Sequence, residues 1–324
     1  MSVGAGAVGG VIAARLVRSG VDLSVFDTNE RHVDLIRSRG VIVDGLDGGT
    51  ATTLDAVMDP PSKVFDVVLL AVRSHHTADA LNAVDGAIGD ATDVVSLQNG
   101  INEDVISDAV GAARTIGCVV GFGSTWIEPG RIELNAEGDL RIGRLDGSQD
   151  ARLHHARELL DAAFPTKITD NIRGALWAKM LVNSMTVLGA LGGMLTGDVL
   201  GTPERRRIVA RVVAEGVRVA RAEGVRLPNV FGVVSPELVD TDEWEPALDA
   251  ALQRIRPAIG AIRSVTWRDF EIGRPTEVDA VTGEIVRRRE RLGVPTPLSE
   301  VVFARLKEIE QGDRAPTASN LDGL

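Results

Sequence analysis

One lysine in this chain stands where its ammonium group could deliver a proton to a substrate. Lys179 precedes Asn183 by four residues, so on a helix the two side chains share one face. The following run, Met180–Gly197, holds no charged residue, and partial desolvation beside it would lower the pKa of the lysine. A lowered pKa makes the ammonium group a better general acid near neutral pH. The alternative is an ordinary lysine paired with a carboxylate at the edge of the helix.

The composition narrows the choice of proton donors and metal sites. There is no tyrosine, and all five histidines precede residue 156, so a second domain would offer lysine or a carboxyl group instead. Cys118 is the only cysteine, which excludes an internal disulfide and a thiolate zinc site. We predict no metal site, because His154 and His155 stand far from any cluster of acidic residues. The lysines are Lys63, Lys167, Lys179 and Lys307.

The charge balance bears on partners and location. A net charge of −11 and an isoelectric point near 5.0 argue against nucleic acid as a ligand. The uncharged run Met180–Gly197 contains Asn183, Ser184 and Thr186 and four glycines, so we interpret it as a buried helix with a following turn and expect no membrane contact. The N-terminus lacks the order of an export signal, and with a single cysteine this predicts a cytoplasmic protein.

A glycine-rich loop near the N-terminus is typical of dinucleotide binding. Gly4, Gly6 and Gly9 form a G-x-G-x-x-G run, with Ala7 and Val8 opening the helix that should follow. The first glycine permits a tight turn, the second lets a pyrophosphate approach the backbone, and the third lets helix and strand pack closely. The N–H groups at the start of the helix would then bind the anion. A glycine-rich turn without a ligand is the alternative.

An acidic residue follows at the distance that this motif requires. Asp27 comes 18 residues after Gly9, at the end of the second predicted strand. Its carboxylate could accept hydrogen bonds from both ribose hydroxyls and would repel a 2′-phosphate, which favours NAD(H). Arg31 and His32 are close enough in sequence to neutralise a phosphate, so NADP(H) stays open. Asp27 could also be only a cap at the end of a strand.

The elements that must position these residues change character about halfway along the chain. Short β-rich runs alternate with amphipathic stretches in the first half, which predicts a doubly wound α/β domain with a parallel sheet. Only Met1–Val3 precede the glycine loop, so either the chain is truncated at its start or the first strand is short. Residues 115–144 resemble a hairpin extension of the sheet.

From residue 169 onward the periodicity is helical only, and we predict an all-α domain. We place the boundary near residue 168, giving domains of residues 1–168 and 169–312 and a loose polar tail of residues 313–324. Three hydroxyl residues, each followed by proline or an acidic first turn, mark predicted helix starts. They are Thr202, Thr276 and Thr296.

Four segments in this order resemble the ketopantoate reductase (2-dehydropantoate 2-reductase) family over nearly the whole chain. The pair W-x-K-x-x-x-N with a later T-E-x-D is far more specific than the glycine loop. The segments are Gly4–Gly10, Ser96–Gly100 (SLQNG), Leu176–Asn183 (LWAKMLVN), and Arg274–Asp279 (RPTEVD) with Asp269 upstream.

The resemblance implies an N-terminal Rossmann domain, a helical C-terminal domain and a substrate cleft between them. It implies that Lys179 is the general acid for a ketone oxygen while the nicotinamide delivers hydride to the carbon. It assigns Glu277 to the substrate oxygen and to orienting the acid, Asn183 to substrate, and Asn99 to nicotinamide and substrate. The alternatives are a first-turn glutamate for Glu277, at a helix N-terminus, and a plain Asn-Gly turn for Asn99.

Departures from the family pattern bear on the substrate. Arg73 replaces a lysine expected near the cofactor phosphate, which keeps the cation but changes its reach. Val187 and Val265 replace an asparagine and a serine expected at the substrate, and Ser264 and Thr266 could compensate only with a change of register. A pocket with these two valines should reject ketopantoate and accept something bulkier or less polar.

The sequence therefore predicts an NAD(P)H-dependent oxidoreductase that reduces a 2-keto acid or related ketone. Oxidation of a hydroxy compound by the same residues remains an alternative. A second alternative is a non-catalytic dinucleotide-binding redox sensor, although such a protein would not need Lys179 and Asn183 together. A homodimer is left open.

Overall fold

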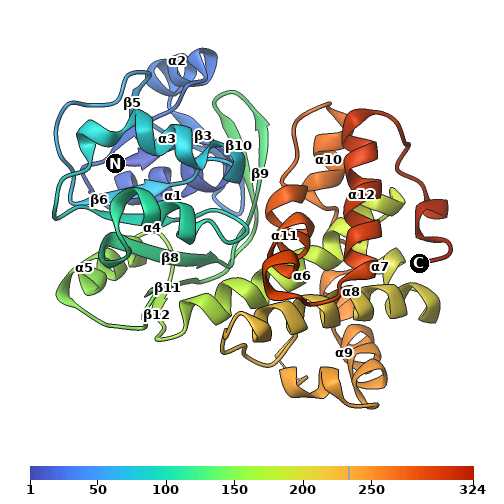
Figure 1. Cartoon of the computed structure of the whole chain (residues 1–324). Helices are drawn as coiled ribbons and strands as arrows, with labels where there is room; N and C mark the ends of the chain where they lie inside the picture. Colours follow the sequence, from blue (N-terminus) through green and yellow to red (C-terminus); the bar gives the residue numbers. More distant parts are fainter. Residues whose placement is uncertain (233) are drawn as a thin grey trace. The chain divides into compact units, whose positions relative to one another are not determined.

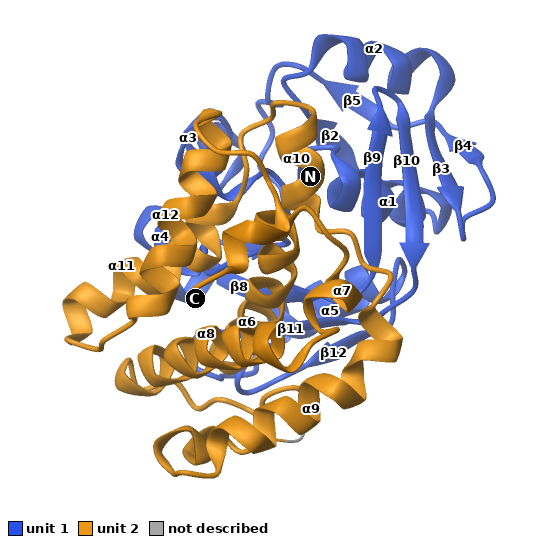
Figure 2. Ribbon diagram, turned by 90° about the vertical axis from the view of Figure 1, so that its right-hand side faces the viewer, with its two compact units in different colours: residues 1–172 blue, residues 173–324 orange. Residues whose placement is uncertain are grey.

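The computed structural model describes residues 1–232 and 234–324 and divides into two compact units. Unit 1 is Met1–Ile172 and unit 2 is Arg173–Leu324 (Figure 2). The division falls four residues after the boundary expected from the sequence. Each unit is described by itself below.

Unit 1 is built on an eight-stranded sheet in the order β12-β11-β8-β7-β6-β1-β2-β5. The two-residue strand β1 pairs in parallel with β2 on one side and β6 on the other. From β5 to β8 this is the strand order of the dinucleotide-binding fold, which confirms the predicted doubly wound α/β class. The strands are β1 (Ser2–Val3), β2 (Ser24–Phe26), β5 (Asp55–Val57), β6 (Val67–Leu70), β7 (Asp93–Ser96), β8 (Thr115–Val120), β11 (Leu140–Arg144) and β12 (Thr166–Ile168).

A second, four-stranded sheet corrects the expectation for residues 115–144. Strands β8 and β11 do extend the main sheet as an antiparallel pair, but β9 and β10 leave it and pair with β3 and β4. The cause is apolar burial, because Ile132 and Leu134 on β10 are fully buried in the core that contains α1. The strands of this sheet are β3 (Val41–Gly45), β4 (Thr50–Thr52), β9 (Gly123–Glu128) and β10 (Arg131–Ala136).

The helices of unit 1 cover the main sheet through two separate cores. Residues of α1 and α5 share one core with the second sheet, and residues of α3 and α4 share the other (Figure 1). Helix α1 therefore has β-structure on two sides, which fixes the helix whose N-terminus follows the glycine loop. The helices are α1 (Ala7–Arg18), α2 (Glu30–Arg39), α3 (Thr77–Ala83), α4 (Glu103–Val110) and α5 (Ala151–Asp161).

Unit 2 is helical, as predicted. Thr202 caps α8, accepting a hydrogen bond from Arg205 N at 3.3 Å with Pro203 in the first turn. Helix α6 is long and apolar enough to cross a membrane, but 72% of its apolar window is buried, as expected for a core helix. The helices are α6 (Ile172–Gly192), α7 (Thr196–Val199), α8 (Pro203–Ala222), α9 (Trp244–Ile259), α10 (Val265–Glu271), α11 (Thr282–Leu292) and α12 (Pro297–Gln311).

The C-terminal residues are not a loose tail, contrary to the expectation for residues 313–324. Asn320 and Leu321 are buried, and a short 3-10 turn spans Ala318–Leu321. The Asn320 amide donates to Leu191 O at 2.9 Å and to Ala315 O at 2.8 Å. A polar composition suggested disorder, but one buried asparagine bonds a carbonyl group at the end of α6 and one within the segment, and so anchors the segment.

Candidate active site

Four loops meet at one edge of the main sheet in unit 1. They follow β1, β2, β6 and β7, which are parallel neighbours, so their carboxyl ends lie at the same edge. Gly4–Gly9 follows β1, Asp27 follows β2, Arg73 follows β6 and Asn99 follows β7. Ligands of open α/β sheets bind at this edge, where the strand order reverses.

The glycine loop fits a pyrophosphate. Gly4 has a φ of +93°, which glycine alone adopts easily, and a side chain on Gly9 would overlap the Gly4 carbonyl and lie 2.8 Å from Ala71 Cβ. A Cβ on Gly6 would meet nothing within 4 Å, so the backbone there faces open space. Among the described residues no side chain caps α1, and its first turn holds no acidic residue. Its N-terminal N–H groups are thus suited to binding an anion.

Asp27 is half-buried beside this loop. Its Oδ2 accepts a hydrogen bond from Ala5 N at 2.8 Å, and its Oδ1 accepts one from Asn29 N at 2.9 Å. The second bond is the strand-end cap considered from the sequence, and the first ties the carboxylate to the glycine loop. Each carboxylate oxygen can accept more than one bond, so these contacts are compatible with ribose hydroxyls as further donors.

His32 does not face a phosphate, which corrects the expectation that it could neutralise one. Its ring is fully buried; Nδ1 accepts a hydrogen bond from Gly130 N at 2.8 Å, and Nε2 lies 2.9 Å from Ala5 O. This pairing assigns the proton to Nε2, which donates to Ala5 O. Burial lowers the pKa of His32, against smaller opposing effects of Ala5 and Asp27. Arg31, its neighbour on α2, is exposed.

A polar network fixes the loop that carries Asn99. Ser74 Oγ donates to Asn99 O at 2.9 Å, and Asn102 Nδ2 donates to the same carbonyl at 2.7 Å. Gln98 Nε2 donates to Val72 O and to Thr77 Oγ1, both at 2.9 Å, so the loops after β6 and β7 are joined. These bonds hold the backbone of Asn99, and its side chain is partly exposed. Sequence reasoning missed these supporting residues, whose only signal is their polarity directly after buried strands.

In unit 2, Lys179 and Asn183 lie on one accessible stripe of helix α6. Both are partly exposed, whereas Trp177, Met180 and Ser184 on the same helix are buried. The helix and the shared face agree with the predicted spacing. The other partly exposed positions of the stripe are Ala178, Val182 and Thr186.

The two valines expected at the substrate occupy different environments. Val187 on α6 is buried, with 3% of its surface exposed, whereas Val265 is 56% exposed as the first residue of α10. Ser264 caps α10, its Oγ accepting a hydrogen bond from Trp267 N at 3.1 Å. This bond fixes Ser264 as the cap of α10 and uses its Oγ as an acceptor, which leaves the O–H group as a donor.

Glu277 directly precedes a short 3-10 turn, so the predicted position at the start of an α-helix is wrong. Thr276 is followed by a three-residue 3-10 turn, Val278–Ala280, and α11 begins only at Thr282. The helical path is broken at Val281, whose φ and ψ are −110° and −86°. Glu277 is partly exposed. In residues 1–232 and 234–324, no three His, Cys, Asp or Glu side chains gather as a group that could hold a metal ion.

A sheet with the strand order of the dinucleotide-binding fold in one unit, followed by a separate helical unit, is compatible with an NAD(P)-dependent oxidoreductase. The sequence matches the family described as ketopantoate reductase PanE/ApbA over residues 1–147, and its C-terminal part over residues 171–310. The chain belongs to the ketopantoate reductase family, whose members are NAD(P)-dependent enzymes acting on CH–OH groups.

Relatives and solved structures agree with this assignment. The chain is 30% identical to a 2-dehydropantoate 2-reductase of Pyrococcus horikoshii over 95% of this chain and 96% of that one. A ketopantoate reductase structure from Ralstonia eutropha JMP134 has a TM-score of 0.83 and 28% identity, covering 97% and 100% of the two chains. D-mandelate dehydrogenase with NADH and anilino(oxo)acetate shares the fold, with a TM-score of 0.84, 22% identity and coverage of 96% and 99%.

Proposed function

We propose that the protein reduces a 2-keto acid or related ketone to the hydroxy compound, with Lys179 as the general acid. The observation that carries the proposal is the pair of Lys179 and Asn183 on the accessible stripe of a helix that is otherwise mostly buried. A family of CH–OH oxidoreductases needs a proton donor for the substrate oxygen. With tyrosine absent and the histidines in unit 1, unit 2 offers few other donors.

The residues of unit 1 bind the coenzyme in this proposal. Gly4, Gly6 and Gly9 shape the pyrophosphate cradle, and the first N–H groups of α1 bind its charge. Asp27 accepts from the adenosine ribose, which favours NAD(H), and Arg31 and Arg73 are the cations proposed to bind a phosphate. Reduced nicotinamide supplies the hydride when it is bound.

The polar residues of unit 2 act on the substrate oxygen. Lys179 Nζ gives its proton to the carbonyl oxygen as the carbonyl carbon gains hydride, and the neutral amine regains a proton from solvent. Asn183 holds the substrate by hydrogen bonds, and Glu277 holds its oxygen against the lysine. Asn99, in unit 1, is assigned to the nicotinamide. Because every step is reversible, the same groups would serve oxidation of the hydroxy compound.

We further propose a substrate bulkier or less polar than ketopantoate. The exposed Val265 offers an apolar surface where a serine is expected, and Val187 removes an amide. The D-mandelate dehydrogenase of similar fold was solved with the aryl oxo acid anilino(oxo)acetate, so aromatic 2-keto acids belong in a substrate panel. A Staphylococcus aureus ketopantoate reductase of the same fold is described as dimeric, which favours a homodimer for this chain too.

The test compares Lys179→Ala with a matched lysine variant. Loss of reduced-coenzyme absorbance is followed with ketopantoate and with aliphatic and aromatic 2-keto acids. We expect Lys179→Ala to lower kcat by about 100- to 10,000-fold while the Kd for coenzyme is unchanged. Lys167→Ala is the control, because Lys167 pairs with Asp139 at the surface of unit 1.

Two outcomes would contradict the proposal. An unchanged kcat in Lys179→Ala removes that residue from proton transfer. Tight coenzyme binding without turnover of any keto or hydroxy acid in either direction would instead favour a redox sensor.

A further inference from the structure

Glu310 of helix α12, which has no role in the proposed reaction, bonds to the segment that carries Glu277. Thr276 N donates to Glu310 Oε1 at 2.8 Å, and Thr276 Oγ1 donates to the same oxygen at 2.5 Å. Thr276 Oγ1 also accepts a hydrogen bond from Val278 N at 3.3 Å. Glu310 therefore holds the backbone and side chain of the residue directly before Glu277.

A lysine on the same helix holds the other end of the turn. Lys307 Nζ lies 2.9 Å from Asp279 Oδ2 and also pairs with Glu310 Oε2. Burial raises the pKa of Glu310, but hydrogen bonds from Lys307 and Thr276 outweigh it and keep the pKa below its ordinary value. Burial opposes the charge of Lys307, while its bonds to Glu310 and Asp279 raise its pKa overall. The four groups thus form one charged network along residues 276–279.

The turn needs such support, because its own backbone gives little. The 3-10 turn has three residues, and the unusual geometry of Val281 separates it from α11. Val278 anchors the turn by burial, but Glu277 next to it is partly exposed. A carboxylate on a short turn can be displaced easily, and a shift of about 1 Å at a reacting group can cost about 100-fold in rate.

We infer that Glu310 and Lys307 are positioning residues that fix Glu277 for the substrate, an inference that rests on the proposed role of Glu277. Neither residue is assigned to the substrate or the coenzyme. They act through Thr276 and Asp279, which flank the glutamate on either side. An isolated pair three residues apart on a helix would contribute little, so the contacts to the turn are the significant part.

A double-mutant cycle between Glu277 and Glu310 tests the inference in the full-length protein. The variants are Glu277→Gln, Glu310→Ala and the double variant, assayed with the best 2-keto acid of the panel. We expect Glu310→Ala to lower kcat/KM by about 10- to 100-fold with an unchanged Kd for coenzyme. In the Glu277→Gln background the same substitution should have almost no further effect, because both changes remove one function.

Controls separate positioning from stability. Glu308→Gln removes a glutamate of the same helix that pairs with Arg314 away from the turn, and it should leave kcat/KM unchanged. Thr276→Ser keeps the hydroxyl and should retain activity, whereas Thr276→Val should behave like Glu310→Ala. If Glu310→Ala fails to fold, Glu310→Gln and Thr276→Val provide the same comparison with smaller changes.

The outcomes distinguish this inference from the proposed function. Normal activity in Glu310→Ala and Thr276→Val, with Glu277→Gln impaired, overturns the positioning role alone. Multiplicative losses in the double variant also overturn it, because Glu310 would then act independently of Glu277. Normal activity in Glu277→Gln overturns both the role of Glu277 and this inference, while Lys179→Ala still tests the reaction itself.

Discussion

In the proposed function, the choice of coenzyme depends on Asp27. We expect the unaltered protein to prefer NADH. Asp27→Ala should lower kcat/KM for NADH by about 10- to 100-fold, because charge-assisted hydrogen bonds to the ribose are lost. NADPH should lose less, since repulsion of its 2′-phosphate disappears as well. Steady-state kinetics with both coenzymes measure the ratio.

The matched control for Asp27 is Asp34→Ala. It removes the same charge from an exposed position of α2. Because Asp27 also holds Ala5 N, part of the NADH loss reflects a looser glycine loop, and this part applies equally to NADPH. A preference of the unaltered protein for NADPH would show that Arg31 dominates over Asp27.

His32 predicts a pH dependence of stability in weak acid. Its pKa is lowered from 6.5 by burial, so the unfolded chain binds this proton more readily than the folded one. The stability that the neutral ring contributes is therefore complete above about pH 6.5 and is lost as the pH falls through the pKa of the folded state. A proton on Nδ1 would face the N–H of Gly130 and displace the ring. Because Nε2 of the same ring is bonded to Ala5 O, this displacement would loosen the glycine loop.

Thermal unfolding and coenzyme affinity measured between about pH 7 and pH 5 check this expectation. His32→Gln should lower stability at pH 7 and flatten the slope, whereas His155→Gln, at an exposed position of α5, should keep it. The comparison is necessary because the Met1 amino group, whose pKa burial lowers to about 5, titrates in an overlapping range. Equal slopes in both variants and the unaltered protein would contradict a role for His32.

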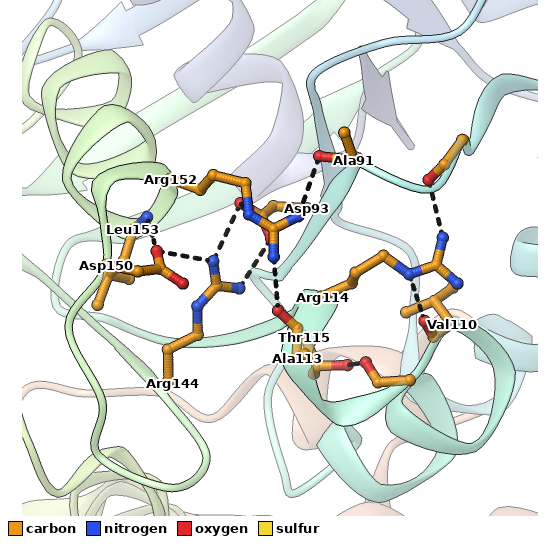
Figure 3. Close-up of polar contacts among 12 residues, drawn as sticks. Ala91, Asp93, Val110, Ala113, Arg114, Thr115, Arg144, Asp150, Arg152 and Leu153 are labelled. Carbon is orange, nitrogen blue, oxygen red and sulfur yellow. Dashed lines mark hydrogen bonds and ion pairs between the residues drawn. The ribbon is translucent and has the colours of Figure 1, made fainter.

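At the scale of elements, a buried ion pair joins β7, β11 and α5. Arg144 donates to Asp93 through two nitrogens, at 2.8 and 3.2 Å, and both side chains are almost completely buried (Figure 3). Arg144 also reaches Asp150, which caps α5 by accepting from Leu153 N at 2.7 Å. Asp93 is the first residue of β7, so the network lies at the opposite end of that strand from the loop that carries Asn99.

Removing one partner of this pair should destabilise unit 1 without altering the coenzyme site. Asp93→Ala leaves a buried guanidinium without its main counter-charge, which we expect to cost about 3–5 kcal/mol in urea unfolding. The Asp93→Leu, Arg144→Met double variant should cost less than the two single changes together. Asp139→Asn is the control, since its pair with Lys167 is exposed. A loss of coenzyme affinity at a temperature where the variant is folded would contradict the expectation that the ion pair at one end of β7 does not affect the loop at its other end.

At the scale of the whole molecule, the sequence predicted features that repeat along the chain. The alternation of strands and helices indicated the sheet of unit 1, and the spacing of Lys179 and Asn183 indicated their shared face on α6. It did not predict that β9 and β10 pair with β3, because alternation marks a strand but not its partner. The Thr276 cap pattern was misleading for a related reason, since contacts with α12 hold that segment as a turn.

Single side chains that reach across long stretches of sequence were the hardest to predict. His32 bonds to Gly130, 98 residues away, and Asn320 bonds to Leu191, 129 residues away. Such contacts leave no periodic signal, and a histidine beside an arginine or an asparagine in a polar tail is common on any surface. The placement of the glycine loop and Asp27 was predictable because their spacing is set by one local strand-helix-strand unit.

The contact between His32 and Trp126, with ring centroids 4.4 Å apart, has an optical consequence. The chain has no tyrosine and four tryptophans, and Trp126 is the only one within residues 1–172. Tryptophan fluorescence from unit 1 therefore arises from Trp126 alone, which contacts His32, and His32 is bonded to Ala5 of the glycine loop. A variant that retains Trp126 and replaces the other tryptophans by phenylalanine would carry its own spectroscopic reporter of coenzyme binding.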